Sequence, residues 1–177
     1  MTIFHAVLLF VVLQRGGELL LARANTASLL RQGAIEIDRD GYKYIVLLHA
    51  AWFLVMVATV PPPTPPNWPL LALFGLLQVA RIWVIASLGR RWTTRLIVLP
   101  GAPLVARGPY RWLRHPNYLI VAAELAILPL AFAAVTIAVL SSACNGWLLW
   151  RRIRLEDDAL DRDSYHIHET LPRRNLL

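Results

Sequence analysis

The stretch LLALFGLLQVARIWVIASL at positions 70–88 decides the class of fold. It carries one charged side chain, Arg81, and an apolar helix of about 20 residues is what a bilayer crossing requires. The stretch before it, PPPTPPNWP at positions 61–69, is uncharged and too rich in proline to be helical. This part of the sequence therefore predicts a membrane-spanning helix that follows a rigid loop.

The composition extends this prediction to the whole chain. Of the 177 residues, 57% are hydrophobic and 16% are charged, whereas a soluble domain usually has about 25% charged residues. Four further apolar segments occupy positions 3–21, 44–60, 118–128 and 130–150. We expect an all-α integral membrane protein with five spans and a short C-terminal helix, formed by a single domain over residues 1–177.

Two of these segments leave alternatives open. Positions 118–150 are too long for one ordinary crossing, and Pro129 divides them. A helical hairpin with a tight turn near Pro129 is the expectation, and one kinked, tilted helix is the alternative. The first segment resembles a signal peptide because Ala22-Arg23-Ala24 could be cleaved, but no basic residue precedes it. A retained helix is the expectation there.

The basic residues alternate between connections. The net charge is +7, and 16 of the 18 Lys and Arg residues fall in three places: positions 23–43, positions 90–114 and the tail after position 150. The other two connections have none. Cytoplasmic loops are enriched in Lys and Arg, so five spans place the N-terminus outside and the C-terminus in the cytoplasm. No nucleic-acid-binding motif accompanies these charges, so we expect no nucleic acid as a partner.

The third connection also contains an apolar, partly β-branched run, Thr93 to Leu99, closed by Pro100-Gly101. This run predicts a short extended segment or a hairpin at the membrane surface.

Four charged residues interrupt the apolar segments: Arg15, Glu18, Arg81 and Glu124. Charges in a span usually face partners or a water-filled cavity. Arg15 and Glu18 are three residues apart on one helix, so they can pair. Structural anchoring and a role in a site both remain open for that pair, and we expect Glu124 to lie near a site.

The densest polar motif is GPYRWLRHPNY at positions 108–118, where the basic connection enters the fourth span. Pro116 suits the first turn of a helix, whose free backbone donors would then lie beside His115 and Tyr118. A second cluster, RRIRLEDD at positions 151–158, follows the fifth span. Under the predicted topology both clusters lie at the cytoplasmic face and can meet, although each alone could be an interfacial or solvated stretch.

Together these two clusters resemble the isoprenylcysteine carboxyl methyltransferase family, which also has five or more spans and a cytoplasmic cofactor site. The resemblance implies S-adenosylmethionine as cofactor, with a motif region at 90–118 and a C-terminal cofactor segment at 150–170. It places His115, Pro116 and Tyr118 in the cofactor pocket, and Glu156, Asp157 and Arg152 match the family's acidic pair and the arginine before it. We add Tyr110 and Arg114 to the expected cofactor-binding residues, and we expect Arg152, Glu124 and Glu156 to be catalytic. Asn117, Leu119, Ile120 and Glu124 are similar to a bacterial branch linked to phenolic lipids.

The chemistry of methyl transfer is compatible with these residues. Carboxylates and aromatic faces suit the cationic parts of the cofactor, and Arg114 or a helix N-terminus suits its carboxylate. A carboxylate acceptor needs only an arginine to orient it, such as Arg152. A phenol would benefit from a base, and Glu124, Glu156 or His115 could provide one. A lipophilic acceptor would enter laterally from the bilayer.

Other readings are weaker. A small transporter or channel subunit would use the four intramembrane charges as a polar path, but no inverted repeat is visible. A scaffold without chemistry and a sterol-reductase-like reaction are further alternatives. No GxGxxG motif of a soluble dinucleotide fold occurs, and the single cysteine, Cys144, predicts neither a disulfide nor a metal site. The sequence leaves the oligomeric state open.

Overall fold

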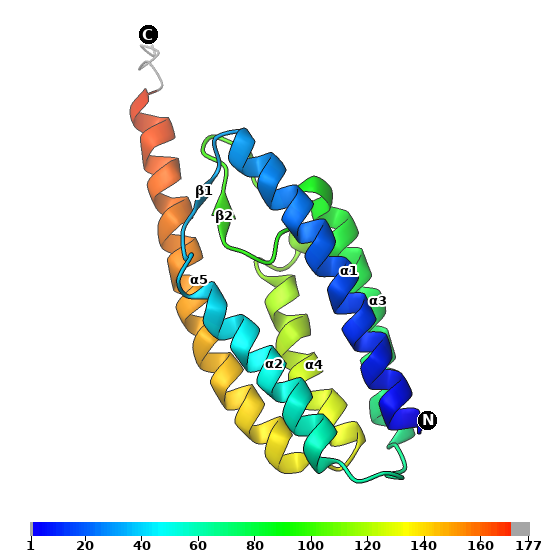
Figure 1. Cartoon of the computed structure of the whole chain (residues 1–177). Coiled ribbons are helices and arrows are strands. Elements are labelled where there is room, and N and C mark those ends of the chain that lie inside the picture. The colour runs from blue at the N-terminus through cyan, green and yellow to red at the C-terminus, as the bar shows by residue number, and fades with distance from the viewer. Residues whose placement is uncertain (1, 171–177) are drawn as a thin grey trace.

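The computed structural model describes residues 2–170, with side chains up to residue 159, and it consists of five long helices (Figure 1). They are α1 (Ile3–Arg31), α2 (Tyr42–Thr59), α3 (Trp68–Leu88), α4 (Pro116–Ala131) and α5 (Val135–Thr170). Two short 3-10 helices, η1 (Gly89–Arg91) and η2 (Gly108–Arg111), lie between α3 and α4. The prediction of an all-α architecture with five helical segments is confirmed.

Three of the helices, α1, α2 and the stretch Trp68–Arg91 that includes α3, are long and apolar enough to cross a membrane, while α4 is a shorter apolar helix. Large apolar side chains point outward on all three, including Leu13, Leu54 and Leu76, each about two-thirds exposed or more. Such outward apolar surfaces suit lipid rather than water. The structure thus supports an integral membrane protein, and the number of spans stays a prediction.

Local sequence explains where the helices begin. The Asn67 side chain accepts a hydrogen bond of 3.2 Å from Leu70 N and caps α3, and Pro69 occupies its first turn. Pro116 similarly occupies the first turn of α4. The Pro-rich loop at positions 61–67 therefore ends where a capping residue and a favourable proline coincide.

The predicted hairpin near Pro129 is confirmed, and the kinked single helix is wrong. Pro129 itself lies inside α4, and the turn comes slightly later, at residues 132–134. Ala133 adopts a positive φ of 55°, and Ala134 N donates to Pro129 O. Pro129 has no N–H to donate to Leu125 O, and the Ser141 hydroxyl on α5 lies 3.2 Å from that oxygen and donates to it instead.

Two helices are longer than the sequence predicted. The helix α1 continues ten residues beyond Leu21, where Asn25 donates to the backbone oxygens of Gly89 and Trp92 and so fixes α1 to the third connection. The helix α5 runs without interruption to Thr170, so the expected separate C-terminal helix is wrong. No helix breaker stands between positions 150 and 170, and the helix simply continues.

The extended segment predicted in the third connection is present, but its partner is not local. Strand β2 (Ile97–Val98) pairs antiparallel with β1 (Ile35–Glu36) from the first basic connection, with Ile35 opposite Val98. The local hairpin alternative is therefore wrong. An ion pair of 2.7 Å between Arg95 and Glu36 supports the same contact. The two basic connections are thus joined at one end of the bundle (Figure 1).

The apolar core fills the opposite end. It includes Phe4, Trp52, Phe74 and Leu128, from four different helices, and Phe4 also contacts Phe132 edge-to-face with ring centroids 5.0 Å apart. In Figure 1 this end holds the N-terminus, the Pro-rich loop and the α4–α5 turn. One end of the bundle is therefore filled by closely packed apolar side chains. The end with the basic connections is the one that can hold polar groups.

Candidate active site

A large cavity of about 880 Å³ lies between the helices and extends from the two basic connections into the bundle. Its wall includes residues from all five helices and from the extended segment around Thr94. Cavities for small molecules and cofactors have volumes of about 300–1,000 Å³. This cavity is therefore large enough to hold a cofactor and part of a second molecule.

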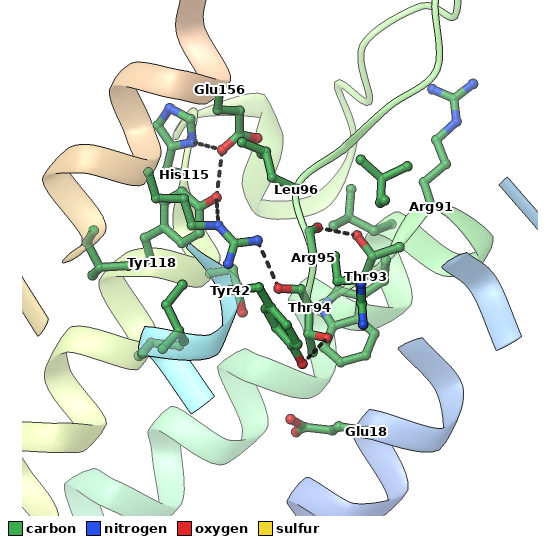
Figure 2. Close-up of a pocket in the computed structure, with 18 of the residues that line it drawn as sticks. Glu18, Tyr42, Arg91, Thr93, Thr94, Arg95, Leu96, His115, Tyr118 and Glu156 are labelled. Carbon is green, nitrogen blue, oxygen red and sulfur yellow. Dashed lines mark hydrogen bonds and ion pairs between the residues drawn. The ribbon is translucent and has the colours of Figure 1, made fainter. Parts of the chain in front are cut away.

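The motif residue His115 and the acidic cluster meet on its wall. His115 precedes α4, and Tyr118 lies in the first turn of that helix. Their rings stack with centroids 5.3 Å apart and planes 13° apart. The Tyr118 hydroxyl donates a hydrogen bond of 2.7 Å to Glu156 Oε2 on α5, and His115 Nδ1 lies 3.5 Å from the same oxygen (Figure 2). Residues forty positions apart thus form one cluster.

Arg152 is tied into this cluster. Its Nε donates to the Tyr118 hydroxyl at 3.0 Å, and its Nη2 donates to the backbone oxygen of Thr94 at 2.9 Å. The Thr94 hydroxyl is in turn 3.0 Å from the hydroxyl of Tyr42 on α2. Arg152 is 8% exposed, yet it lines the cavity. These bonds fix a buried cation at the cavity wall in one orientation.

The remaining motif residues surround this cluster. Arg114 forms an ion pair of 3.0 Å with Asp157, and Tyr110 lines the cavity. Burial raises the pKa of the Tyr110 hydroxyl above its ordinary value, and the negative charge of Glu156 adds to the effect. The Tyr110 hydroxyl therefore stays neutral. Pro116 is buried at the start of α4.

Two polar atoms in the motif are buried without a hydrogen bond to any described residue, namely His115 Nε2 and Asn117 Oδ1, and both residues line the cavity. His115 Nε2 does lie 3.5 Å from Asp157 Oδ1, an ion-pair contact if the ring is protonated. A buried polar atom without a partner is costly. These two atoms therefore mark a place where a polar ligand would be bound favourably.

Glu124 lies apart from this cluster. It is 2% exposed, and the cavity wall does not include it. Its Oε1 accepts from Gln78 at 2.9 Å, and its Oε2 accepts from Arg15 and Arg81 at 2.6 and 3.2 Å. The structure thus brings the other predicted site residues together and places Glu124 in a second, deeper group.

That deeper group joins the charges of α1, α3 and α4. Glu18 pairs with Arg15 and Arg81, each at 2.7 Å, and the prediction that Arg15 and Glu18 pair is confirmed. Arg15, Glu18 and Arg81 line the deep part of the cavity, where Figure 2 shows Glu18 across from His115 and Glu156. Two arginines and two glutamates neutralise one another there.

Sequence reasoning missed several cavity residues, among them Tyr42, His49, Thr94 and Asn145. A signal was available on two helices. On α2, Tyr42, His49 and Phe53 recur at intervals of seven and four residues, and on α5, Asn145, Arg152 and Glu156 do the same. This spacing marks one face of a helix, although each residue alone looks ordinary.

Comparison with known proteins gives two matches. Residues 70–162 match the sequence model of the isoprenylcysteine carboxyl methyltransferase family. The chain is also 38% identical over 165 residues to the protein described as uncharacterized protein YpbQ of Bacillus subtilis (strain 168), with 91% of this chain and 98% of that protein covered. No solved structure matches the chain.

Proposed function

The chain belongs to the isoprenylcysteine carboxyl methyltransferase family, and on that premise we propose that it methylates an oxygen of a lipophilic acceptor with S-adenosylmethionine. Membership indicates a membrane methyltransferase. The proposal adds the cofactor, an acceptor that is a carboxylate or a phenolic lipid, and a site at the cytoplasmic face. The observation that carries it is the linked cluster of His115, Tyr118, Arg152 and Glu156 on the wall of the large cavity.

The residues present suit this cofactor. Asn117 Oδ1 and His115 Nε2, which make no hydrogen bond with any described residue, offer polar atoms to a ligand, and the Glu156 carboxylate suits the cationic parts. Arg114, paired with Asp157 at 3.0 Å, would bind the cofactor carboxylate. When bound, S-adenosylmethionine supplies an electrophilic methyl group.

The protein's own contribution is positioning. Tyr118 and Thr94 hold Arg152 at the cavity wall, and its guanidinium would orient the acceptor oxygen beside the cofactor site. A carboxylate acceptor needs no base. For a phenol, Glu156 or His115 would take the proton, because both line the cavity, whereas Glu124 already accepts hydrogen bonds on both oxygens.

The transporter alternative is not favoured. Arg15, Glu18, Arg81 and Glu124 bond one another in a neutral group, and the end of the bundle beyond them is packed with apolar side chains. A polar path across the membrane would need free polar groups on both sides of this group.

The test is binding of S-adenosylhomocysteine to the detergent-purified protein by calorimetry. His115→Ala should weaken binding by about tenfold or more, because it removes both a stacking ring and a polar contact. His5→Ala is the matched control, since His5 is exposed at the start of α1. Failure of the folded protein to bind, or equal binding by His115→Ala, would contradict the proposal.

A further inference from the structure

A second groove, of about 550 Å³, lies at the end of α3. It is lined by three arginines, Arg90, Arg91 and Arg107, and by five apolar residues, among them Leu88 and Leu104. No carboxylate and no aromatic ring belongs to this lining. A groove that gathers three cations without an acid attracts an anion.

The arginines come from two segments that meet at the end of α3. Arg90 belongs to η1, and Arg107 directly precedes η2. Arg107 Nε donates a hydrogen bond of 2.7 Å to the backbone oxygen of Ser87 in the last turn of α3. Its Nη2 lies 3.8 Å from the position that a Cβ would occupy on Gly89. The Arg107 guanidinium is therefore held beside the residue that precedes Arg90.

Arg91 links the same two segments a second time. Its Nη1 donates to the backbone oxygen of Pro103, and Figure 2 shows its side chain extending away from His115 and Glu156. A guanidinium has five N–H donors, and the side chains of Arg91 and Arg107 use one each in these bonds with described residues. Both guanidinium groups are thus positioned and still have donors for a ligand.

The charges of this groove are not neutralised by the described part of the chain. None of its three arginines forms an ion pair with a described carboxylate. By contrast, Arg95, Arg114 and Arg151 each have such a partner at 2.7–3.0 Å. The sequence explains the difference, because no Asp or Glu occurs at positions 41–123. An anion for this groove must therefore come from outside these residues.

Two exposed tryptophans place the groove at the surface of a membrane. Trp83 on α3 and Trp112 after η2 lie with ring centroids 6.2 Å apart, and both rings are largely exposed. Tryptophan is enriched at the boundary between hydrocarbon and headgroups. Arg90 follows Trp83 by seven residues, which is about 10 Å along a helix axis. The arginines therefore lie at the level of the lipid headgroups.

We propose that this groove binds the headgroup phosphate of an anionic phospholipid, with Arg90, Arg91 and Arg107 as its ligands. Guanidinium groups bind phosphate oxygens through paired N–H donors, and basic pockets at the cytoplasmic side of spans suit anionic headgroups. A choline headgroup is less suited, because the lining offers its ammonium neither a carboxylate nor an aromatic face. The exposed Leu104 would contact the acyl chains. The proposal does not depend on methyl transfer.

A lipid in this groove would also act on the large cavity. Positions 103–106 line both the groove and the cavity, so this stretch is a wall that the two share. It belongs to no helix or strand. Arg91 bonds to its first residue, Pro103, and Arg107 follows its last. A headgroup bound to both arginines would therefore restrain the shared wall at its two ends.

The test titrates delipidated, detergent-purified protein with dioleoylphosphatidylglycerol or dioleoylphosphatidylcholine and follows lipid binding by native mass spectrometry. The unsubstituted protein should bind phosphatidylglycerol about tenfold more tightly or more. The combined variant Arg90→Gln, Arg91→Gln and Arg107→Gln should reduce this preference to within about twofold. Arg90→Gln alone should lower it by about threefold without loss of thermal stability, because the Arg90 side chain is exposed.

The matched control is the combined variant Arg23→Gln, Arg31→Gln and Arg39→Gln. It removes the same number of positive charges from exposed positions in the first basic connection, and it should keep the preference. Equal affinity of the unsubstituted protein for the two lipids would overturn the proposal. An equal loss of preference in the two combined variants would do so too, because binding would then follow net charge alone.

Hydrogen exchange locates the bound lipid. The amides at positions 104–106 should exchange about threefold more slowly in phosphatidylglycerol nanodiscs than in phosphatidylcholine nanodiscs. The difference should vanish in the variant that lacks Arg90, Arg91 and Arg107. Unchanged exchange at these positions would place the lipid elsewhere and contradict the proposal. Equal slowing by soluble glycerol phosphate in phosphatidylcholine nanodiscs would make the groove a site for free phosphate compounds and reject a lipid.

Discussion

The hydroxyl of Tyr118 on α4 donates a 2.7 Å hydrogen bond to Glu156 Oε2 on α5, and the same hydroxyl accepts from Arg152 Nε at 3.0 Å. One phenol thus joins a buried cation to a carboxylate at the cavity wall. Because the Tyr118 hydroxyl bonds to both groups, it fixes the distance between them. The Glu156 carboxylate is proposed to bind the cofactor, and the Arg152 guanidinium is proposed to bind the acceptor.

Tyr118→Phe should weaken S-adenosylhomocysteine binding by about tenfold, since a hydrogen bond to a charged group contributes about 1.5–3 kcal/mol. The ring and its stacking on His115 are kept, but Glu156 and Arg152 each lose a hydrogen bond, so the thermal midpoint should fall as well. Calorimetry measures the affinity. Tyr44→Phe, on the exposed side of α2, is the control, and an unchanged affinity in Tyr118→Phe would remove this bond from the site.

Arg152→Lys should separate turnover from cofactor binding. A lysine cannot donate to Tyr118 and Thr94 in the geometry of a guanidinium. We expect kcat for methylation of 4-dodecylphenol, a phenolic lipid, to fall by about tenfold or more while S-adenosylhomocysteine affinity stays within about twofold. Arg154→Lys, exposed two residues later, should behave as the unsubstituted protein. A tenfold loss of cofactor affinity would instead place Arg152 in the cofactor site.

Glu124→Gln should mainly reduce stability. Removing one partner of a buried ion pair typically costs about 3–5 kcal/mol, because the opposite charges remain buried, here those of Arg15 and Arg81. The thermal midpoint in detergent should fall clearly, and S-adenosylhomocysteine affinity should persist in the protein that remains folded. Asp158→Asn, at an exposed position, is the control. A stable variant that had lost turnover would support the catalytic role that the sequence predicted.

Gly108→Ala should destabilise the motif more than Gly33→Ala. Both glycines have a positive φ, 58° and 91°, so alanine strains the backbone at each. At Gly33 the added methyl meets open space, whereas at Gly108 it collides with the side chain of Ser87. A fall in thermal midpoint that is equal in the two variants would show that Ser87 moves aside at little cost.

The proposed orientation predicts a labelling pattern in intact cells. With Cys144 replaced by alanine, Pro65→Cys in the Pro-rich loop should react with a membrane-impermeant maleimide, and Asp40→Cys should react after permeabilisation alone. Both positions are exposed, and they lie in connections at opposite ends of the bundle (Figure 1). The reverse labelling pattern would mean that the protein has the opposite orientation in the membrane, with the site on the outer face.

Much of the fold and part of the site were predictable because they depend on local chemistry. Apolar runs longer than a bilayer crossing identify helices, and Pro116 beside His115 fixes where α4 begins. The meeting of His115 with Glu156 was also predicted, since alternate basic connections must lie at the same end. The long α5 was missed, as was the pairing of β1 with β2, because the partner of an extended segment can be anywhere in the chain.

By itself, then, the sequence determined the all-helical character, the common end of the basic connections and the two polar clusters, since lipid accepts only helices with satisfied backbones and few charges. The tertiary structure decided which polar side chains line the cavity and which are buried away from it. Glu124 is an intramembrane carboxylate in the sequence, and only packing places it against Arg15 and Arg81 instead of in the cavity wall. Asn145 and His49 were likewise inconspicuous in the sequence, and only the packing of the helices places both on the wall of one cavity.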